Sequence, residues 1–474
     1  SETIRAPVPS THVHRRTAAG FRLCDGKPAS WSPGPHLCAM VCSRSVVGGL
    51  SWLLLLVSPH AGASLLASTH RRARRPLIYL RGGEVVAADL KNNAGASARY
   101  RAYDLNKDGT LDENELRLAI ATAVQRVDQK EATDPIIIQF THKAAWLWRQ
   151  WRGTAFELVW KPMLFSTGFA GVIELLVRDG AHTFAAPDAT NAIVQRLLTL
   201  NTAWSVVLSL TTFVLTFFLG QTYTYWRAMF TEGRSIQGRV HDTNLLLAAH
   251  AVRDERGEYT PDARELLTAV GRNLHLVHTM FWASRDRSLS VLHTPEGLKQ
   301  MVARGLMTDD ERNRLESCGP AGGRWKVVCA WITTRVAVAR DRGLLIGGAG
   351  FEQTILANLC AMRGKMGTIA DGPNDRMPLA YVHIVQVLVD FLLLLAPAAL
   401  YPKMGLMSVP LSGVIVFFYR GLLELSKSFL DPWGNDGSEA QNVNIDVLLA
   451  EVHKDTPLWA NAGQCAPISW KAAA

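Results

Sequence analysis

The sequence of 474 residues is poor in charge and has few cysteines. Asp, Glu, Lys and Arg make up 19% of it, whereas about 25% is usual in soluble proteins. The seven cysteines form no CxxC pair and no Cys/His metal spacing, which argues against a disulfide framework or a zinc site. No Walker, Rossmann or nucleophile-elbow motif occurs in a convincing context. We therefore expect neither a disulfide scaffold nor an enzyme.

The net charge of +9 arises from the first 83 residues. They contain eleven of the 50 Lys and Arg residues but only two acids, Glu2 and Asp25, so residues 84–474 carry no net charge. The basic pI therefore predicts a leader, not a nucleic-acid partner.

Within this leader, residues 1–39 lack apolar periodicity, and we expect them to be untranslated or fragmentary sequence. Residues 40–63 read as a secretory signal peptide, with Arg44, an apolar run at 46–57 and a small-residue cleavage pattern at 61–63. Residues 64–83 hold five arginines and no acid. This two-part leader resembles those of algae with secondary plastids and predicts a thylakoid or envelope membrane. An ordinary secreted leader would instead predict the secretory pathway or plasma membrane.

Residues 104–115, DLNKDGTLDENE, match the calcium-binding loop of an EF-hand within a segment at 84–130. Gly109 takes the sharp-turn position, and Glu115 closes a shell of about seven oxygens around a hard cation. The six ligand positions are Asp104, Asn106, Asp108, Thr110, Asp112 and Glu115. The sequence thus predicts Ca²⁺ as a cofactor. No second loop is found, so a lone loop should bind weakly or pair with another chain; a decayed or structural loop is the alternative.

Long apolar runs predict a protein embedded in a lipid bilayer. Residues 197–226 contain no charged side chain, which is typical of a transmembrane helix. We expect four spans, at about 158–178, 202–226, 378–401 and 404–424, the last two forming a hairpin around Pro402 and Lys403. His383 and Asp390 share one face of the third span, which predicts a packed polar contact or a pore-facing position, with a proton pair as the alternative.

A charged, helix-patterned block at 234–376 separates the two pairs of spans. Thr294 followed by Pro295 predicts one helix start. Thr308 followed by Glu311 predicts a capping box at another.

Several stretches from about 147 to 459 resemble the bestrophin family of anion channels. They include LWRQWRGTAFELVWKPMLF, FLGQTYTYWRAMFTEGR, TPEGLKQMVARGLMTDDERNRLES, PLAYVHIVQVLVDFLLLL and FFYRGLLELSKSFLDPWGND. The aromatic pair that the family has before the Glu is reduced here to Phe230 and Thr231. The EF-hand lies outside the resemblance, as does a tail at 460–474.

The resemblance implies an all-α membrane protein with four transmembrane helices per subunit. It implies a homopentamer that conducts chloride or bicarbonate through a central pore, and the EF-hand predicts that calcium modulates it. Phe213, Phe217 and Gln221 would form the pore neck, and Gly350 with Phe351 the cytosolic aperture. Gln221 departs from the apolar residue that the family has there. Packing between helices is the alternative for the two phenylalanines, and a non-conducting calcium-binding scaffold is the alternative function.

Two further features remain open at this level. The resemblance implies a second calcium site at Asp431, Asp436 and Glu439, although Gly437 and Ser438 replace acids of the family's cluster. A turn capped by Asp431 is the alternative. Arg227 and Arg234, near the inner end of the pore helix, would attract anions or instead form structural salt bridges.

Overall fold

The computed structural model describes residues 112–151, 153–177, 192–318, 320–373, 376–435 and 442–466. All of them belong to one compact unit, 73–474. The leader, four of the EF-hand ligand positions (Asp104, Asn106, Asp108 and Thr110), and Asp436 and Glu439 lie outside the described residues. Within the described ranges the chain is helical, with two isolated β-bridges between single residues.

The described helices pack as two groups, and α7 takes part in both. The first group comprises α6 (Ala155–Val177), α7 (Ala192–His250), α13 (Leu379–Met404) and α14 (Ser408–Phe429). The second group comprises α4 (Glu113–Asp128), α8 (Pro261–Ala283), η1 (Arg287–His293), α9 (Pro295–Ala303), α10 (Asp309–Ser317), η2 (Ala321–Gly323), α11 (Arg324–Asp341), α12 (Gly348–Asp371) and α15 (Ile445–Gln464). A short helix, α5 (Ala144–Arg149), precedes α6, and η3 (Gly405–Met407) joins α13 to α14.

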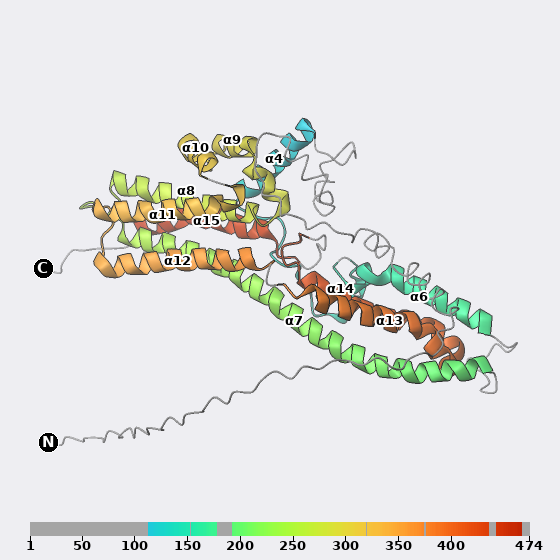
Figure 1. Cartoon of the computed structure of the whole chain (residues 1–474). Helices are drawn as coiled ribbons and strands as arrows, with labels where there is room; N and C mark the ends of the chain where they lie inside the picture. Colours follow the sequence, from blue (N-terminus) through green and yellow to red (C-terminus); the bar gives the residue numbers. More distant parts are fainter. Residues whose placement is uncertain are drawn as a thin grey trace, which may run out of the picture. The chain divides into compact units, whose positions relative to one another are not determined.

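Helix α7 belongs to both groups (Figure 1). It has 59 residues, and at about 1.5 Å per residue it is about 90 Å long, some three times the thickness of a bilayer's hydrocarbon core. Its first half packs against α13 and α14, and its second half packs against α12 and α15. The predicted span at 202–226 is therefore one part of a much longer helix.

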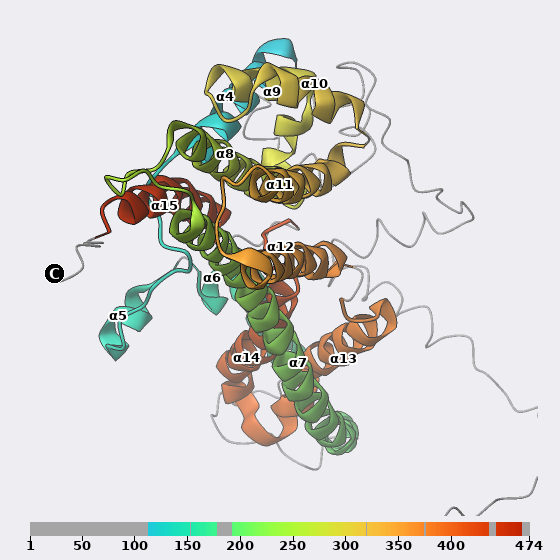
Figure 2. The ribbon, with the colours of Figure 1, turned by 90° about the vertical axis from the view of Figure 1, so that its left-hand side faces the viewer.

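The second group of helices forms the larger hydrophobic core. Trp282, Trp325 and Phe281 are fully buried at its centre, and α8, α11 and α12 lie side by side (Figure 2). Both predicted helix starts are confirmed. The Thr294 side chain accepts a hydrogen bond from Gly297 N, and Thr308 and Glu311 form the reciprocal capping box.

The apolar helices α6, α13 and α14 pack as a smaller bundle on the first half of α7. Contacts join α6 to α14 and α13 to α7, with small cores around Phe218 and Trp204. Helix α13 runs through Pro402 to Met404, and the reversal follows at Gly405, whose φ is +52°. The turn expected at Pro402 and Lys403 is therefore wrong by a few residues, because the glycine, not the proline, supplies the left-handed backbone that ends the helix.

Two stretches are long and apolar enough to cross a membrane, α7 and the continuous run Leu379–Phe429 that contains α13 and α14. Only 22% of the apolar window in each stretch is buried within the chain, so these surfaces must be covered by lipid or by other protein. Helix α6 is not among the described stretches that are long and apolar enough to cross a membrane. It contains three charged residues, Glu157, Lys161 and Glu174.

Three histidines are enclosed in the larger core. His275 stacks on His453 with ring centroids 4.4 Å apart, and His278 Nε2 accepts a hydrogen bond from Trp282 Nε1 at 2.9 Å. Burial lowers the pKa of each of His275, His278 and His293 to about 3. These side chains are therefore neutral at physiological pH.

Candidate functional site

The face of α7 that carries Phe213 and Phe217 is bare in the single chain. The two phenylalanine residues are 73% and 56% exposed, and Gln221 is exposed one turn further on. The opposite face is buried, with Leu215 and Phe218 at 2% and 0% exposure. Because residues four apart lie one above another on a helix, the three exposed side chains form one row.

Specific contacts hold α7 in this rotation. Trp204 Nε1 donates to the carbonyl oxygen of Leu392 at 2.9 Å, and Asn201 Nδ2 donates to that of Ala399 at 2.7 Å. Further along, the ring of Phe218 meets Tyr381 edge to face. Each of these contacts joins the buried side of α7 to α13. The row at Phe213 is therefore turned away from the bundle that holds the helix.

The exposed face also carries hydroxyl groups but no charge. The hydroxyl of Thr212 lies 2.6 Å from that of Tyr419 on α14. Most of the other hydroxyls donate to a carbonyl oxygen of α7 itself, four residues back, as at Thr202, Ser209, Thr216 and Thr224. Since their donors are already used, they present oxygen lone pairs and methyl groups to whatever lies against the face. The face is thus weakly polar and uncharged along the whole run 197–226.

The predicted aperture pair divides between surface and core. Gly350 is exposed, and a Cβ added to it would meet nothing within 4 Å. Phe351 is 6% exposed, and its ring stacks on His250 with centroids 4.2 Å apart. Phe351 is therefore a core residue of the single chain, whereas Gly350 lies at its surface. Phe351 lies in the first turn of α12, and its ring is on the side of this helix that packs against the core.

The two arginines near the inner part of α7 differ in their surroundings. Arg234 forms an ion pair with Glu451 of α15, with 2.5 Å between Nη1 and Oε2. Arg227 is exposed, and it forms no ion pair with another described residue. Arg234 thus corresponds to the structural alternative, and Arg227 remains the candidate for attracting anions.

A closed ring of polar contacts joins α13 to α14. Asp390 pairs with Arg420 at 2.6 Å, and Arg420 with Glu424 at 2.9 Å. Glu424 pairs with Lys427 at 2.8 Å, Lys427 donates to Gln386, and Gln386 donates back to Asp390 at 2.7 Å. Of the alternatives left open for Asp390, the structure shows a packed polar contact, and its partners are Arg420 and Gln386. The signal was present in α14, where Arg420, Glu424 and Lys427 recur at spacings of four and three.

Two of the six residues predicted as EF-hand ligands are described, and they lie together at the start of α4. Asp112 is the N-cap, its Oδ1 accepting from Glu115 N at 2.8 Å, while Glu115 Oε2 accepts from Asp112 N at 3.0 Å. Glu115 is 4% exposed. Two carboxylates thus converge where the backbone N–H groups of a helix begin. This arrangement fits an oxygen-ligand site, because positions 9 and 12 of the loop must approach one another.

The turn after α14 is organised by Asp431, which is 3% exposed. Its Oδ1 accepts from Asn435 N at 2.8 Å and lies 3.6 Å from Arg376 Nη2. This corresponds to the capped turn that the sequence allowed as the alternative to a second calcium site. Asp436 and Glu439, the other two predicted ligands, lie outside the described residues.

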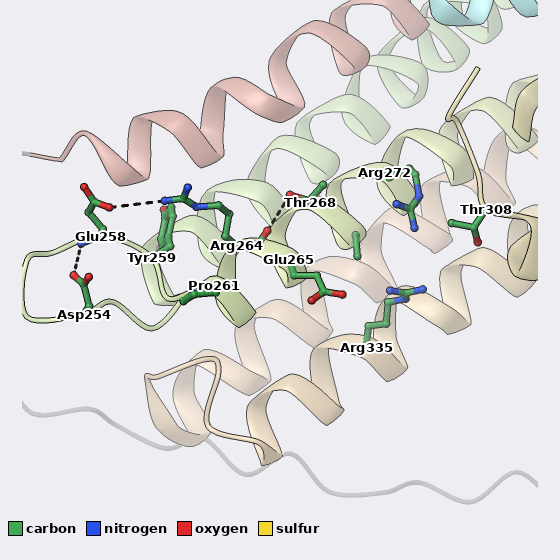
Figure 3. Close-up of a pocket in the computed structure, with 11 residues that line it drawn as sticks. Asp254, Glu258, Tyr259, Pro261, Arg264, Glu265, Thr268, Arg272, Thr308 and Arg335 are labelled. Carbon is green, nitrogen blue, oxygen red and sulfur yellow. Dashed lines mark hydrogen bonds and ion pairs between the residues drawn. The ribbon is translucent and has the colours of Figure 1, made fainter. Parts of the chain in front are cut away.

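A pocket of about 750 Å³ lies on α8 and α11 (Figure 3). Arg272 and Arg335 at its edge both pair with Glu311, at 3.1 and 3.3 Å. Burial opposes ionisation of Glu311, but hydrogen bonds from Asn273 and Thr308 and the Arg272 ion pair lower its pKa. Glu311 lies outside the lining but compensates these two arginines, and the lining itself balances Arg264, Arg272 and Arg335 with Asp254, Glu258 and Glu265, so the pocket offers no net positive charge to an anionic ligand.

A family model described as bestrophin, RFP-TM, chloride channel matches residues 138–451. The chain belongs to the bestrophin family. This region, the bestrophin domain, includes the α7 face, the α13–α14 ring and the turn at Asp431. It begins after α4, so the segment predicted to hold an EF-hand lies outside it.

The curated relatives of this bestrophin are distant. Bestrophin-2a of Homo sapiens is 24% identical over 309 residues, which are 62% of this chain and 57% of that protein. Bestrophin-1 of Sus scrofa is 24% identical over 334 residues, 65% of this chain and 53% of that protein. The chain thus spans little more than half the length of these relatives. A solved bacterial bestrophin homolog from Klebsiella pneumoniae aligns over 63% of this chain and 97% of its own, with 14% identity and a TM-score of 0.45.

Proposed function

We propose that this bestrophin is an anion channel whose pore is lined by the bare face of α7. The observation that carries the proposal is the exposed row of Phe213, Phe217 and Gln221 on a helix whose other side is fixed to α13. A row of large apolar rings is unfavourable in water. Repeated around a symmetry axis, the same row becomes the wall of a narrow pore. Five copies, as in the family resemblance, would form a homopentamer.

Four membrane spans per subunit fit this arrangement. The two apolar stretches supply three of them, in α7, α13 and α14, and α6 supplies the fourth because it packs along α14. Its charged residues Glu157 and Lys161 lie in its first two turns, where a span meets water. The membrane that we expect is that of the plastid.

Weak attraction would favour anions in such a pore. The edge of a phenylalanine ring carries partial positive charge, and an ion that must leave again should not be held tightly. Arg227 adds positive charge near the end of the uncharged run without an acidic partner among the described residues. Chloride and bicarbonate are the permeant ions we expect.

Calcium would modulate the channel through the EF-hand loop. Asp104, Asn106, Asp108, Thr110, Asp112 and Glu115 would hold the ion, and support for this comes from the pairing of Asp112 with Glu115 at the start of α4. Bound Ca²⁺ would supply positive charge and a fixed coordination shell there. Asp431 with Asp436 and Glu439 is a second candidate site.

The pore assignment is tested by Phe217→Ala in the purified full chain, reconstituted in vesicles. Removing five rings from a constriction that gates partly by dewetting should raise chloride flux and loosen gating. The matched control is Phe165→Ala, which removes a ring that is 52% exposed on α6 and should leave flux unchanged. Normal assembly with unchanged flux in Phe217→Ala would remove Phe217 from the pore. Absence of flux in the wild type would favour the non-conducting scaffold.

A further inference from the structure

Helix α4 lies outside the bestrophin domain but inside its core. The helix ends at Asp128, ten residues before the family match begins. Its apolar side is buried among η1, α9 and α15, with exposures of 0–2% at Ala119, Ile120, Ala123, Val124 and Val127. The exit helix of the EF-hand loop is therefore an integral part of the helical block, not an appendage.

Arg126 ties α4 to two acids of the bestrophin domain. Its Nε donates to both carboxylate oxygens of Asp446, at 2.9 and 3.0 Å, and its Nη1 donates to Ser288 Oγ at 2.7 Å. Its Nη2 lies 3.3 Å from Asp286 Oδ2. The guanidinium thus joins three elements, α4, η1 and the start of α15, in a setting where its side chain is 23% exposed.

Residues 285–287, at the start of η1, also hold the turn that follows α14. Asn435 Nδ2 donates to the carbonyl oxygen of Arg285 at 2.8 Å, and Arg287 N donates to Asn435 Oδ1 at 3.4 Å. Asn435 N in turn donates to Asp431 Oδ1. Asp286, which Arg126 contacts, lies between Arg285 and Arg287 in the sequence. A continuous set of contacts therefore runs from α4 to residues 431–435, directly after α14 ends at Phe429.

The geometry points to Arg126 as the residue that couples the calcium loop to the membrane helices, through η1 and the turn at 431–435. This inference rests on the proposed function, in which the loop binds calcium and the helices conduct. Glu115 and Arg126 are eleven positions apart, three helical turns, so they lie on the same face of α4. A change at the first turn of a packed helix is carried to its last turn because packed interiors transmit strain.

The test compares two arginines of α4 in the full chain. Arg126→Gln breaks the contacts to Asp446 and Asp286, while Arg117→Gln breaks an ion pair with Glu113 whose side chains are 68% and 79% exposed. Calcium affinity is measured by calorimetry, and amide hydrogen exchange at residues 431–435 is measured with and without calcium. In the wild type and in Arg117→Gln we expect calcium to slow this exchange by at least about fivefold.

In Arg126→Gln we expect calcium binding to persist and the calcium effect at 431–435 to disappear. Asp446→Asn, which keeps the side-chain volume, should behave in the same way and serves if Arg126→Gln does not fold. Retention of the wild-type protection in both variants would overturn the inference, as would a wild type in which calcium leaves 431–435 unchanged.

Chloride flux on the same preparations separates this inference from the proposed function. A wild type that shows the calcium effect at 431–435 but no flux contradicts the channel and leaves the coupling standing. A wild type that conducts but shows no such effect contradicts the coupling alone.

Discussion

At the scale of single residues, the charges of α13 and α14 compensate one another. Asp390, Arg420, Glu424 and Lys427 are each 24–32% exposed, and each meets an opposite charge. Within an apolar hairpin, an isolated charge is expensive and a paired one is tolerated. The ring therefore holds α13 against α14 at the end of the hairpin far from the turn at Gly405.

Removing Asp390 should destabilise the protein because Arg420 keeps its charge and loses one of its two partners. We expect Asp390→Ala to lower the free energy of unfolding by about 2 kcal/mol, less than the 3–5 kcal/mol of a fully buried pair because water reaches these side chains. The control is Arg314→Ala, whose partner Asp310 is 71% exposed, with an expected effect below about 1 kcal/mol. Thermal unfolding in detergent measures both, and equal effects would contradict the ring's role.

The buried histidines predict loss of stability in acid. The pKa of His275, His278 and His293 is about 3 in the folded chain and about 6.5 when unfolded. Between these values the unfolded state binds more protons, so stability rises with pH. Each histidine should therefore lower the free energy of unfolding by about 1.4 kcal/mol per pH unit as the pH falls below 6.5.

His278→Gln, which keeps an acceptor for Trp282, should flatten this dependence by about a third, since it removes one of three such groups. The exposed His142 provides the control, and His142→Gln should leave the slope unchanged. The free energy of unfolding of each variant, measured from pH 7 to pH 5, tests this prediction. Equal slopes of that free energy against pH in the two variants would contradict the lowered pKa of His278.

The features that could be predicted from the sequence, such as a shared helix face or a cap, are those governed by local spacing. Phe213, Phe217 and Gln221 recur every four residues, so a helix necessarily places them in one row. The cap at Thr308 likewise depends on a partner three residues away. The partner of Asp390 could not be predicted, because Arg420 lies thirty residues further on, on another helix. The burial of Phe351 could not be predicted either, because spacing within α12 does not tell which side of that helix meets the core.

At the scale of elements, the close approach of α6 to α14 depends on Gly413. A Cβ on Gly413 would overlap Thr167 Oγ1, which is held by a hydrogen bond to the carbonyl oxygen of Met163. Gly413→Val should therefore force the two helices apart and cost about 1–3 kcal/mol of unfolding free energy.

The same replacement at Gly171 of α6 enters open space, where a Cβ meets nothing within 4 Å. Gly171→Val should be neutral or slightly stabilising, because glycine is the poorer helix former. The melting temperatures of the two variants in detergent test the prediction. A loss of stability in Gly171→Val equal to that in Gly413→Val would show that the contact with Thr167 does not matter.

At the scale of the whole molecule, the single chain leaves much apolar surface uncovered, including Phe213 and Phe217. In the proposed channel, copies of the same row would cover one another in a closed symmetric ring. We expect native mass spectrometry of the detergent-solubilised protein to give a pentamer. A stable monomer or dimer would contradict both the oligomer and the pore lining built on it.

Helix α7 has a mechanical consequence. It is a single rod without proline, anchored at one end by Trp204 and Asn201 and at the other by contacts to α12 and α15. Such a helix lacks the proline at which helices most often kink. In the proposed channel, a movement of its far end with α12 or α15 would therefore be carried to the Phe213 row, so that the helical block and the width of the pore would change together.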